Sequence, residues 1–154
     1  MTFRADFTVR DTGGSLVAVA EVKNSQPMTI EIARSLRHNL IESGSLPVTP
    51  YFLIVSQHEA FVWDQRSGSD SDAPPTARIP MRTVFERYLP RFDLNQHVRG
   101  RELAYGVAQW LNDLTQSTNG LGVDNTRDTV DGGDMPLEFA AAIHGGAIAL
   151  EDPV

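Results

Sequence analysis

The feature that most constrains the fold is an apolar run, Tyr51 to Ser56, that comes after a strand-like segment and a helix-like segment. Five apolar residues stand in a row there, as in a strand that is covered on both faces. The preceding segment, Thr29 to Ser43, has apolar residues at helical spacing, with Thr29 as a candidate N-cap and Gly44 as a candidate stop. A strand, a helix and a buried strand in this order predict a βαβ unit with a right-handed crossover.

Two segments near the start of the chain predict a β-hairpin. In Phe3 to Arg10 apolar and polar residues alternate, as in a half-buried strand, so Asp6 is expected to point away from the apolar face. Asp11 to Gly14 has the residues of a hairpin turn, and Ser15 to Lys23 is the expected returning strand. Together with the βαβ unit, this hairpin predicts an α/β fold with a mixed sheet.

Further elements are expected downstream. Ala60 to Asp64 is a candidate short strand, and the Ser-, Asp- and Pro-rich segment 65–78 is expected to be a mobile surface loop. Met81 to Leu89 is a candidate short helix. Gly100 to Thr115 has the clearest helical periodicity of the chain, and it predicts a helix that packs its Trp110 side on the sheet.

The charge distribution divides the chain into parts. Residues 1–114 carry 13 acidic and 12 basic residues, whereas residues 115–154 carry 7 acidic residues and one basic residue, Arg127. We therefore expect one α/β domain over 1–115, an acidic linker over 116–135 and a C-terminal segment over 136–154, for which one helix interrupted at Gly145-Gly146 is expected.

Composition excludes several classes of site. The chain has no cysteine, so disulfides, thiolate nucleophiles and sulfur-ligated metals are excluded. No stretch reaches the roughly 18 apolar residues of a membrane span, and the polar start lacks the layout of a signal peptide. We expect a cytoplasmic protein that does not enter a membrane, in which any metal is bound by oxygen or imidazole ligands.

Three charged residues of the predicted hairpin form the strongest candidate site. Glu21 and Lys23 are two residues apart on one strand, so their side chains share a face of the sheet. Asp6 joins them if strand pairing brings it level. Two neighbouring carboxylates suit a shared hard cation, Mg²⁺ or Mn²⁺, beside which an ammonium group could orient a nucleophile or stabilise developing charge. Lys23 is also the single lysine among 13 basic residues.

Asp6, the Glu21-Val22-Lys23 motif, and the helix and buried strand that follow resemble the PD-(D/E)XK nuclease superfamily, which has the restriction-endonuclease-like fold. The resemblance runs from about Phe3 to Asp64. Three stretches also resemble uncharacterised prokaryotic members: Ala20-Glu21-Val22-Lys23-Asn24, Leu36-Arg37-His38-Asn39-Leu40 and Pro50-Tyr51-Phe52-Leu53-Ile54-Val55-Ser56.

The resemblance implies a mixed sheet with a hairpin, a crossover helix, a buried parallel strand and C-terminal helices. It also implies that Asp6, Glu21 and the backbone carbonyl of Val22 bind Mg²⁺ or Mn²⁺, and that Lys23 is catalytic along with the two acids. The implied function is metal-dependent hydrolysis of phosphodiester bonds in nucleic acid, DNA ahead of RNA. Arg34, Arg37 and His38 on the crossover helix are weaker candidates for contacts with nucleic acid.

One departure from the family keeps a second interpretation open. Members usually have a helix and a strand before the motif aspartate, and only five residues precede Asp6. The sheet would then lack an edge strand and a covering helix. A homodimer, a partner subunit or the segment 136–150 could cover it. The alternative function is a catalytically inactive interaction or scaffold module on the same fold; a nucleic-acid-mimicking acidic tail is a third interpretation.

Overall fold

The structure is a computed structural model of the whole chain. It describes residues 6–23, 28–44, 46, 49–66, 68, 70–89, 100–116, 139 and 142–150. The expected linker over 116–135 lies outside these residues except for its first position, 116, which ends a helix.

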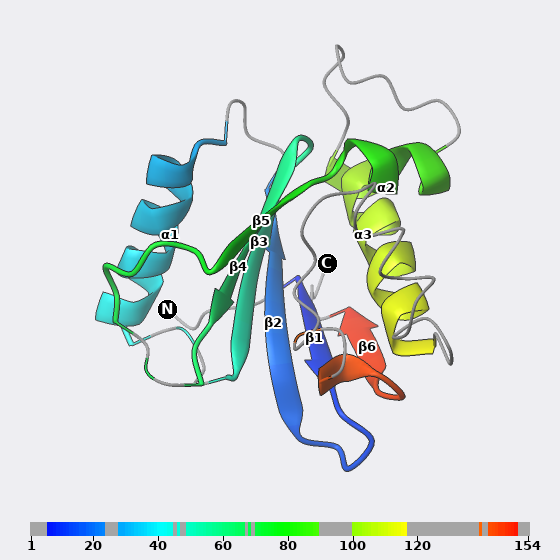
Figure 1. Cartoon of the computed structure of the whole chain (residues 1–154), viewed down its shortest axis with the longest axis horizontal. Helices are drawn as coiled ribbons and strands as arrows, with labels where there is room; N and C mark the ends of the chain where they lie inside the picture. Colours follow the sequence, from blue (N-terminus) through cyan, green and yellow to red (C-terminus); the bar gives the residue numbers. More distant parts are fainter. Residues whose placement is uncertain are drawn as a thin grey trace.

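The described residues form an α/β fold with six strands and three helices. In chain order these are β1 (Phe7–Arg10), β2 (Leu16–Val22), α1 (Ile30–Glu42), β3 (Tyr51–Val55), β4 (Glu59–Asp64), β5 (Ala77–Pro80), α2 (Arg82–Tyr88), α3 (Gly100–Gln116) and β6 (Ala147–Leu150). The strands make one sheet, with α1 on one face and α2 and α3 on the other (Figure 1).

The sheet is mixed and has the order β5-β4-β3-β2-β1-β6. β1 and β2 are an antiparallel hairpin, and β2 and β3 are parallel and connected through α1. The remaining neighbours are antiparallel. All five residues of β3 are buried, as the unbroken apolar run predicts. The expected hairpin, crossover helix and buried parallel strand are therefore confirmed.

The ends of α1 have the expected signals. The Thr29 hydroxyl accepts a hydrogen bond from the backbone N–H of Ile32 at 3.2 Å, which satisfies one of the orphan donors of the first turn. At the other end, Gly44 has a φ of 74°, a left-handed conformation that favours glycine after a helix. The covered side of α1, which includes Ala33, packs with Met28 on the sheet residues Val19, Phe52, Ile54, Phe61 and Trp63.

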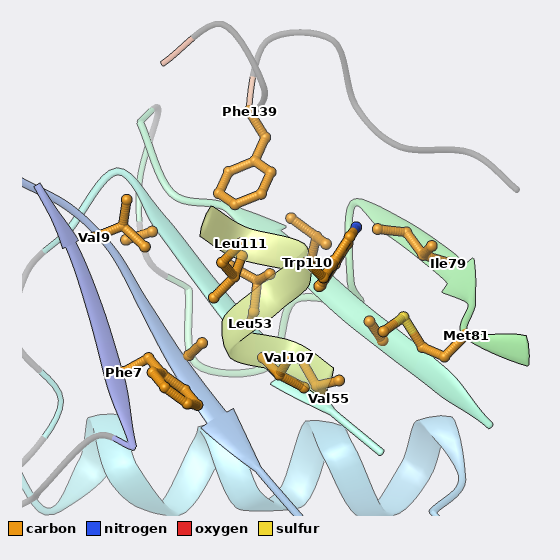
Figure 2. Close-up of a cluster of buried hydrophobic side chains, with 14 of the residues drawn as sticks. Phe7, Val9, Leu53, Val55, Ile79, Met81, Val107, Trp110, Leu111 and Phe139 are labelled. Atoms are coloured by element: carbon orange, nitrogen blue, oxygen red, sulfur yellow. The ribbon is translucent and has the colours of Figure 1, made fainter. Parts of the chain in front are cut away.

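The larger part of the core lies between the sheet and the other two helices. Figure 2 shows Val107, Trp110 and Leu111 of α3 among side chains of the strands. Trp110 is 6% exposed, so the expected packing of this helix on the sheet is confirmed. Phe139 is fully buried in the same cluster, which shows that the C-terminal part of the chain contributes to the core.

The end of the chain differs from the expected interrupted helix. Phe139, Ala142 and Ile143 are helical, but Ala147–Leu150 is strand β6, paired antiparallel with β1. The helical expectation was wrong for this strand because the edge of β1 offers backbone partners that the local sequence does not reveal. A Cβ on Gly146 would lie 1.9 Å from the carbonyl oxygen of Arg10, so glycine permits this close approach.

β6 also supplies the edge strand that the hairpin was expected to lack. It pairs with all four residues of β1, and α2 and α3 cover the adjoining face. A homodimer or partner subunit is therefore not required to fill this edge of the sheet.

The segment 65–78 was expected to be a mobile loop, and the structure describes most of it in contact with other elements. Its last two residues begin strand β5. The Arg37 guanidinium donates to Gln65 Oε1 and to the Asp70 carbonyl oxygen, and the indole N–H of Trp63 donates to the Ala73 carbonyl at 3.0 Å. These bonds connect the segment to α1 and β4.

None of the helices in the described ranges combines the length and apolar character that crossing a membrane requires.

Candidate metal and catalytic site

The β1–β2 pairing brings Asp6 and Glu21 together. The last register pair at this end of the hairpin is Phe7 with Ala20, so Asp6 and Glu21 are the next residues outward on the two strands. The backbone N–H of Val22 donates to Asp6 Oδ2 at 2.7 Å. Asp6 therefore lies beside the end of β2.

The same hydrogen bond orients the Val22 peptide. The N–H and C=O of one residue in a strand point to the same side, because paired residues in an antiparallel ladder exchange both bonds. Since the Val22 N–H is directed at Asp6, its carbonyl also faces the β1 side. On the other side of β2, the backbone N–H of Lys23 donates to the Val55 carbonyl at 2.9 Å, which ties this end of β2 to β3.

Glu21 and Lys23 form an ion pair on one face of β2. Lys23 Nζ lies 3.2 Å from Glu21 Oε2, and the side chains are 36% and 12% exposed, respectively. The other carboxylate oxygen, Glu21 Oε1, is buried and has no hydrogen-bond partner among the described residues. A buried carboxylate oxygen without a partner is costly, so this oxygen is the least satisfied polar atom of the site.

The pKa of the Glu21 carboxyl depends on its burial and on its charged neighbours. Burial raises the pKa of the Glu21 carboxyl above its usual range, and the nearby Asp6 carboxylate raises it further, while the Lys23 ammonium group and the backbone N–H of Asp6 lower it. Two close carboxylates disfavour simultaneous ionisation unless a cation compensates them.

The donor set fits a hard divalent ion. Asp6 and Glu21 supply carboxylate oxygens. The Val22 carbonyl points toward β1, which is the side of β2 on which Asp6 lies. Mg²⁺ in proteins is commonly held by one or two carboxylates and keeps several waters. Within the described ranges, no group of three or more histidine, cysteine, aspartate or glutamate side chains has the arrangement of a metal site.

The three candidate nucleic-acid contacts on α1 lie away from this site. Arg37 is 1% exposed and its guanidinium stands over the Trp63 ring, so it has a structural role and the interpretation as a surface contact was wrong. Arg34 donates to the Asp72 carbonyl, and His38 pairs with the Asp72 carboxylate.

Arg37 and Lys23 are separated because they lie near opposite ends of β3. The Arg37 partner Gln65 is bonded to Thr49 and to the Pro50 carbonyl, before β3 begins. Lys23, in contrast, is bonded to Val55, where β3 ends. Four residue steps along a strand span about 13 Å.

One ion pair at the same end of the sheet was not found from the sequence. Arg78 on β5 makes two hydrogen bonds of 2.9 Å to the Glu59 carboxylate on β4, and Ser56 beside Glu59 follows directly on Val55. Arg78 lies in the segment 65–78, for which a loop was expected, so no strand pairing connected it with Glu59. The signal that could have found it is the alternation in Ala77–Pro80.

Comparison of the chain with models of known protein families, with curated proteins and with solved structures found no match.

Proposed function

We propose that this protein is a divalent-metal-dependent nuclease of the restriction-endonuclease-like fold, with Asp6, Glu21 and Lys23 at its catalytic site. The substrate would be the phosphodiester backbone of nucleic acid, DNA ahead of RNA. The observation that carries the proposal is the buried, unpartnered oxygen Glu21 Oε1 beside a second carboxylate. A cation at this position would satisfy that oxygen and remove the repulsion between the two acids.

The residues of the site have separate roles in this proposal. Asp6, Glu21 and the Val22 carbonyl would hold Mg²⁺ or Mn²⁺. When bound, the ion supplies charge neutralisation at the phosphodiester and activation of a water. Asp6 also accepts the Val22 N–H, which fixes the peptide whose carbonyl faces the site; a carboxylate has about four lone-pair sites, so it retains acceptor capacity.

Lys23 would act on the reacting groups. Its side chain is one-third exposed and shares the Glu21 face of the strand. An ammonium group is a compact point charge with three rotatable donors. It would orient the attacking water or stabilise the charge that develops on the phosphate in the transition state.

Metal binding is the first test. Titration calorimetry with Mn²⁺ should give binding heat for the wild type and none for Glu21→Gln. The matched control is Glu86→Gln, because Glu86 is an exposed carboxylate on α2 whose ion-pair partner is Arg82; this variant should bind like the wild type. Equal heats in the wild type and Glu21→Gln would remove the metal site.

Nuclease activity is the second test. Plasmid, single-stranded DNA and RNA are incubated with the full chain and Mg²⁺ or Mn²⁺, and cutting should be lost with EDTA and in Lys23→Ala. Arg66→Ala is the control, because Arg66 pairs with Asp64 at the opposite end of the sheet. Undiminished cutting by Lys23→Ala would contradict the catalytic role.

A second candidate function is a catalytically inactive interaction or scaffold module on the same fold. The contact that favours it is the Lys23–Glu21 pair at 3.2 Å, because the ammonium group already gives Glu21 a cationic partner. This function predicts no Mn²⁺ heat and no cutting. It also predicts that Lys23→Ala lowers the melting temperature, because the largely buried Glu21 carboxylate loses its counter-charge.

A further inference from the structure

Arg78 lies on the same face of the sheet as Glu21. A row of paired residues crosses the sheet from β2 to β5, and its members are Glu21, Ile54, Phe61 and Arg78. Ile54 and Phe61, in the middle of the row, belong to the cluster that packs under α1. Because directly paired residues share a face, Glu21 and Arg78 both project on the α1 face. Three steps of about 4.8 Å between neighbouring strands put their Cα atoms about 14 Å apart.

The next row outward connects Lys23 with the partner of Arg78. The backbone N–H of Lys23 donates to the Val55 carbonyl, and the backbone N–H of Ser56, the next residue, donates to the Glu59 carbonyl. Two strand spacings, about 10 Å, therefore separate Lys23 from Glu59. Glu59 in turn accepts both hydrogen bonds of the Arg78 guanidinium. Two cationic side chains thus lie on either side of the turn that joins β3 and β4.

The Arg78 side chain is accessible to a ligand. It is 51% exposed, and its partner Glu59 is 26% exposed. An exposed ion pair contributes little to stability in water, so another anion can replace the carboxylate at low cost. The planar guanidinium suits a phosphate as well as it suits a carboxylate, with two parallel hydrogen bonds in either case. The Phe61 ring lies under the guanidinium at 5.7 Å, which supports it on the sheet.

We propose that Arg78 binds a phosphate of the DNA backbone away from the bond that is cut, and that Glu59 holds the guanidinium in place when DNA is absent. This inference rests on the proposed function, because it names a contact that holds the same substrate. The 14 Å between Arg78 and Glu21, itself an estimate of about three strand spacings, corresponds to about four nucleotide steps of about 3.4 Å along a duplex strand.

Binding of a short labelled DNA duplex to the full chain tests the inference, measured by fluorescence anisotropy in EDTA so that the duplex is not cut. Arg78→Gln should weaken the affinity about eightfold at about 0.1 M salt, because one lost phosphate contact releases about 0.9 fewer counterions. The slope of log affinity against log salt should decrease by about 0.9. Glu59→Gln should have the opposite effect and tighten binding, because the guanidinium loses the carboxylate that competes with the phosphate.

The ion pair between Arg66 and Asp64 is the matched control. Asp64 lies at the other end of β4 from Glu59, and the two side chains are 52% and 26% exposed, as in the Arg78 pair. Arg66→Gln and Asp64→Asn make the same changes in net charge. Each should change the affinity by less than about twofold, because salt at about 0.1 M screens charges that lie more than about 10 Å from the bound duplex.

Several outcomes would overturn the inference and leave the proposed nuclease in place. One is a wild type that cuts DNA while Arg78→Gln binds the duplex as tightly as the wild type. Equal weakening by Arg78→Gln and Arg66→Gln would show an effect of net charge alone. Weakening by both Arg78→Gln and Glu59→Gln would show that the pair only stabilises the fold.

The proposed function can fail separately. Binding that depends on Arg78, in a wild type that cuts no DNA, would support the phosphate contact and refute the nuclease. If the wild type neither binds nor cuts DNA, the proposed function and this inference fail together.

Discussion

Replacing Phe139 by alanine tests whether the C-terminal segment completes the core. Phe139 is fully buried, and its ring meets the ring of Tyr51 edge-on at a centroid distance of 5.2 Å. Removing a buried phenyl ring costs about 3–5 kcal/mol, a range that includes the aromatic contact. A domain of this size has about 5–15 kcal/mol of stability, so the loss is a large share of it.

Urea unfolding followed by circular dichroism measures this loss. With a slope of about 2 kcal/mol per molar urea, Phe139→Ala should lower the midpoint by about 1.5–2.5 M. Tyr105→Ala is the control, because Tyr105 is 57% exposed on α3, and such a surface change should stay within about 0.5 kcal/mol. A loss below about 1 kcal/mol for Phe139→Ala, or an equal loss for Tyr105→Ala, would refute the assignment of this segment to the core.

Three further predictions concern single charged or polar groups. Arg37→Met should destabilise the fold by about 1–3 kcal/mol, because the buried Gln65 amide oxygen loses its donors; chemical unfolding measures it. In EDTA at pH 7, Glu21→Gln should melt above the wild type. The gap should close as the pH falls toward 4, because the raised pKa of Glu21 means that the folded state holds this proton more tightly than the unfolded state. Burial and the hydrogen bond to Asp113 raise the pKa of Tyr88 to about 12, so its contribution to stability is complete below its usual pKa of 10.0 and is lost toward pH 12; Tyr88→Phe should remove a tyrosinate signal at 295 nm that titrates near pH 12.

The order of elements could be predicted because each element carried its own signal. The apolar run in β3, the alternation in the hairpin and the helical spacing in α1 and α3 are local patterns, and the structure has strands and helices at these places. Residues two apart in a strand must share a face, so the grouping of Glu21 with Lys23 was also determined locally.

The errors came from residues whose neighbours are distant in sequence. Arg37 reads as a surface cation on a helix, yet 28 residues separate it from Gln65, whose side chain accepts its hydrogen bonds in the interior. β5 was not predicted from its polar segment, because its strand conformation depends on pairing with β4. Short elements of this kind gain most of their stability from tertiary partners, which no local pattern records.

Local patterns were enough to predict the strand–helix–strand order and which side chains share a face, because backbone periodicity is a property of neighbouring residues. Three features required the folded chain: Asp6 bonds to the Val22 peptide, Arg37 is interior, and β6 pairs with the edge of β1. These outcomes depend on which distant segments bury apolar surface and satisfy backbone groups together, and that competition is settled by the whole chain.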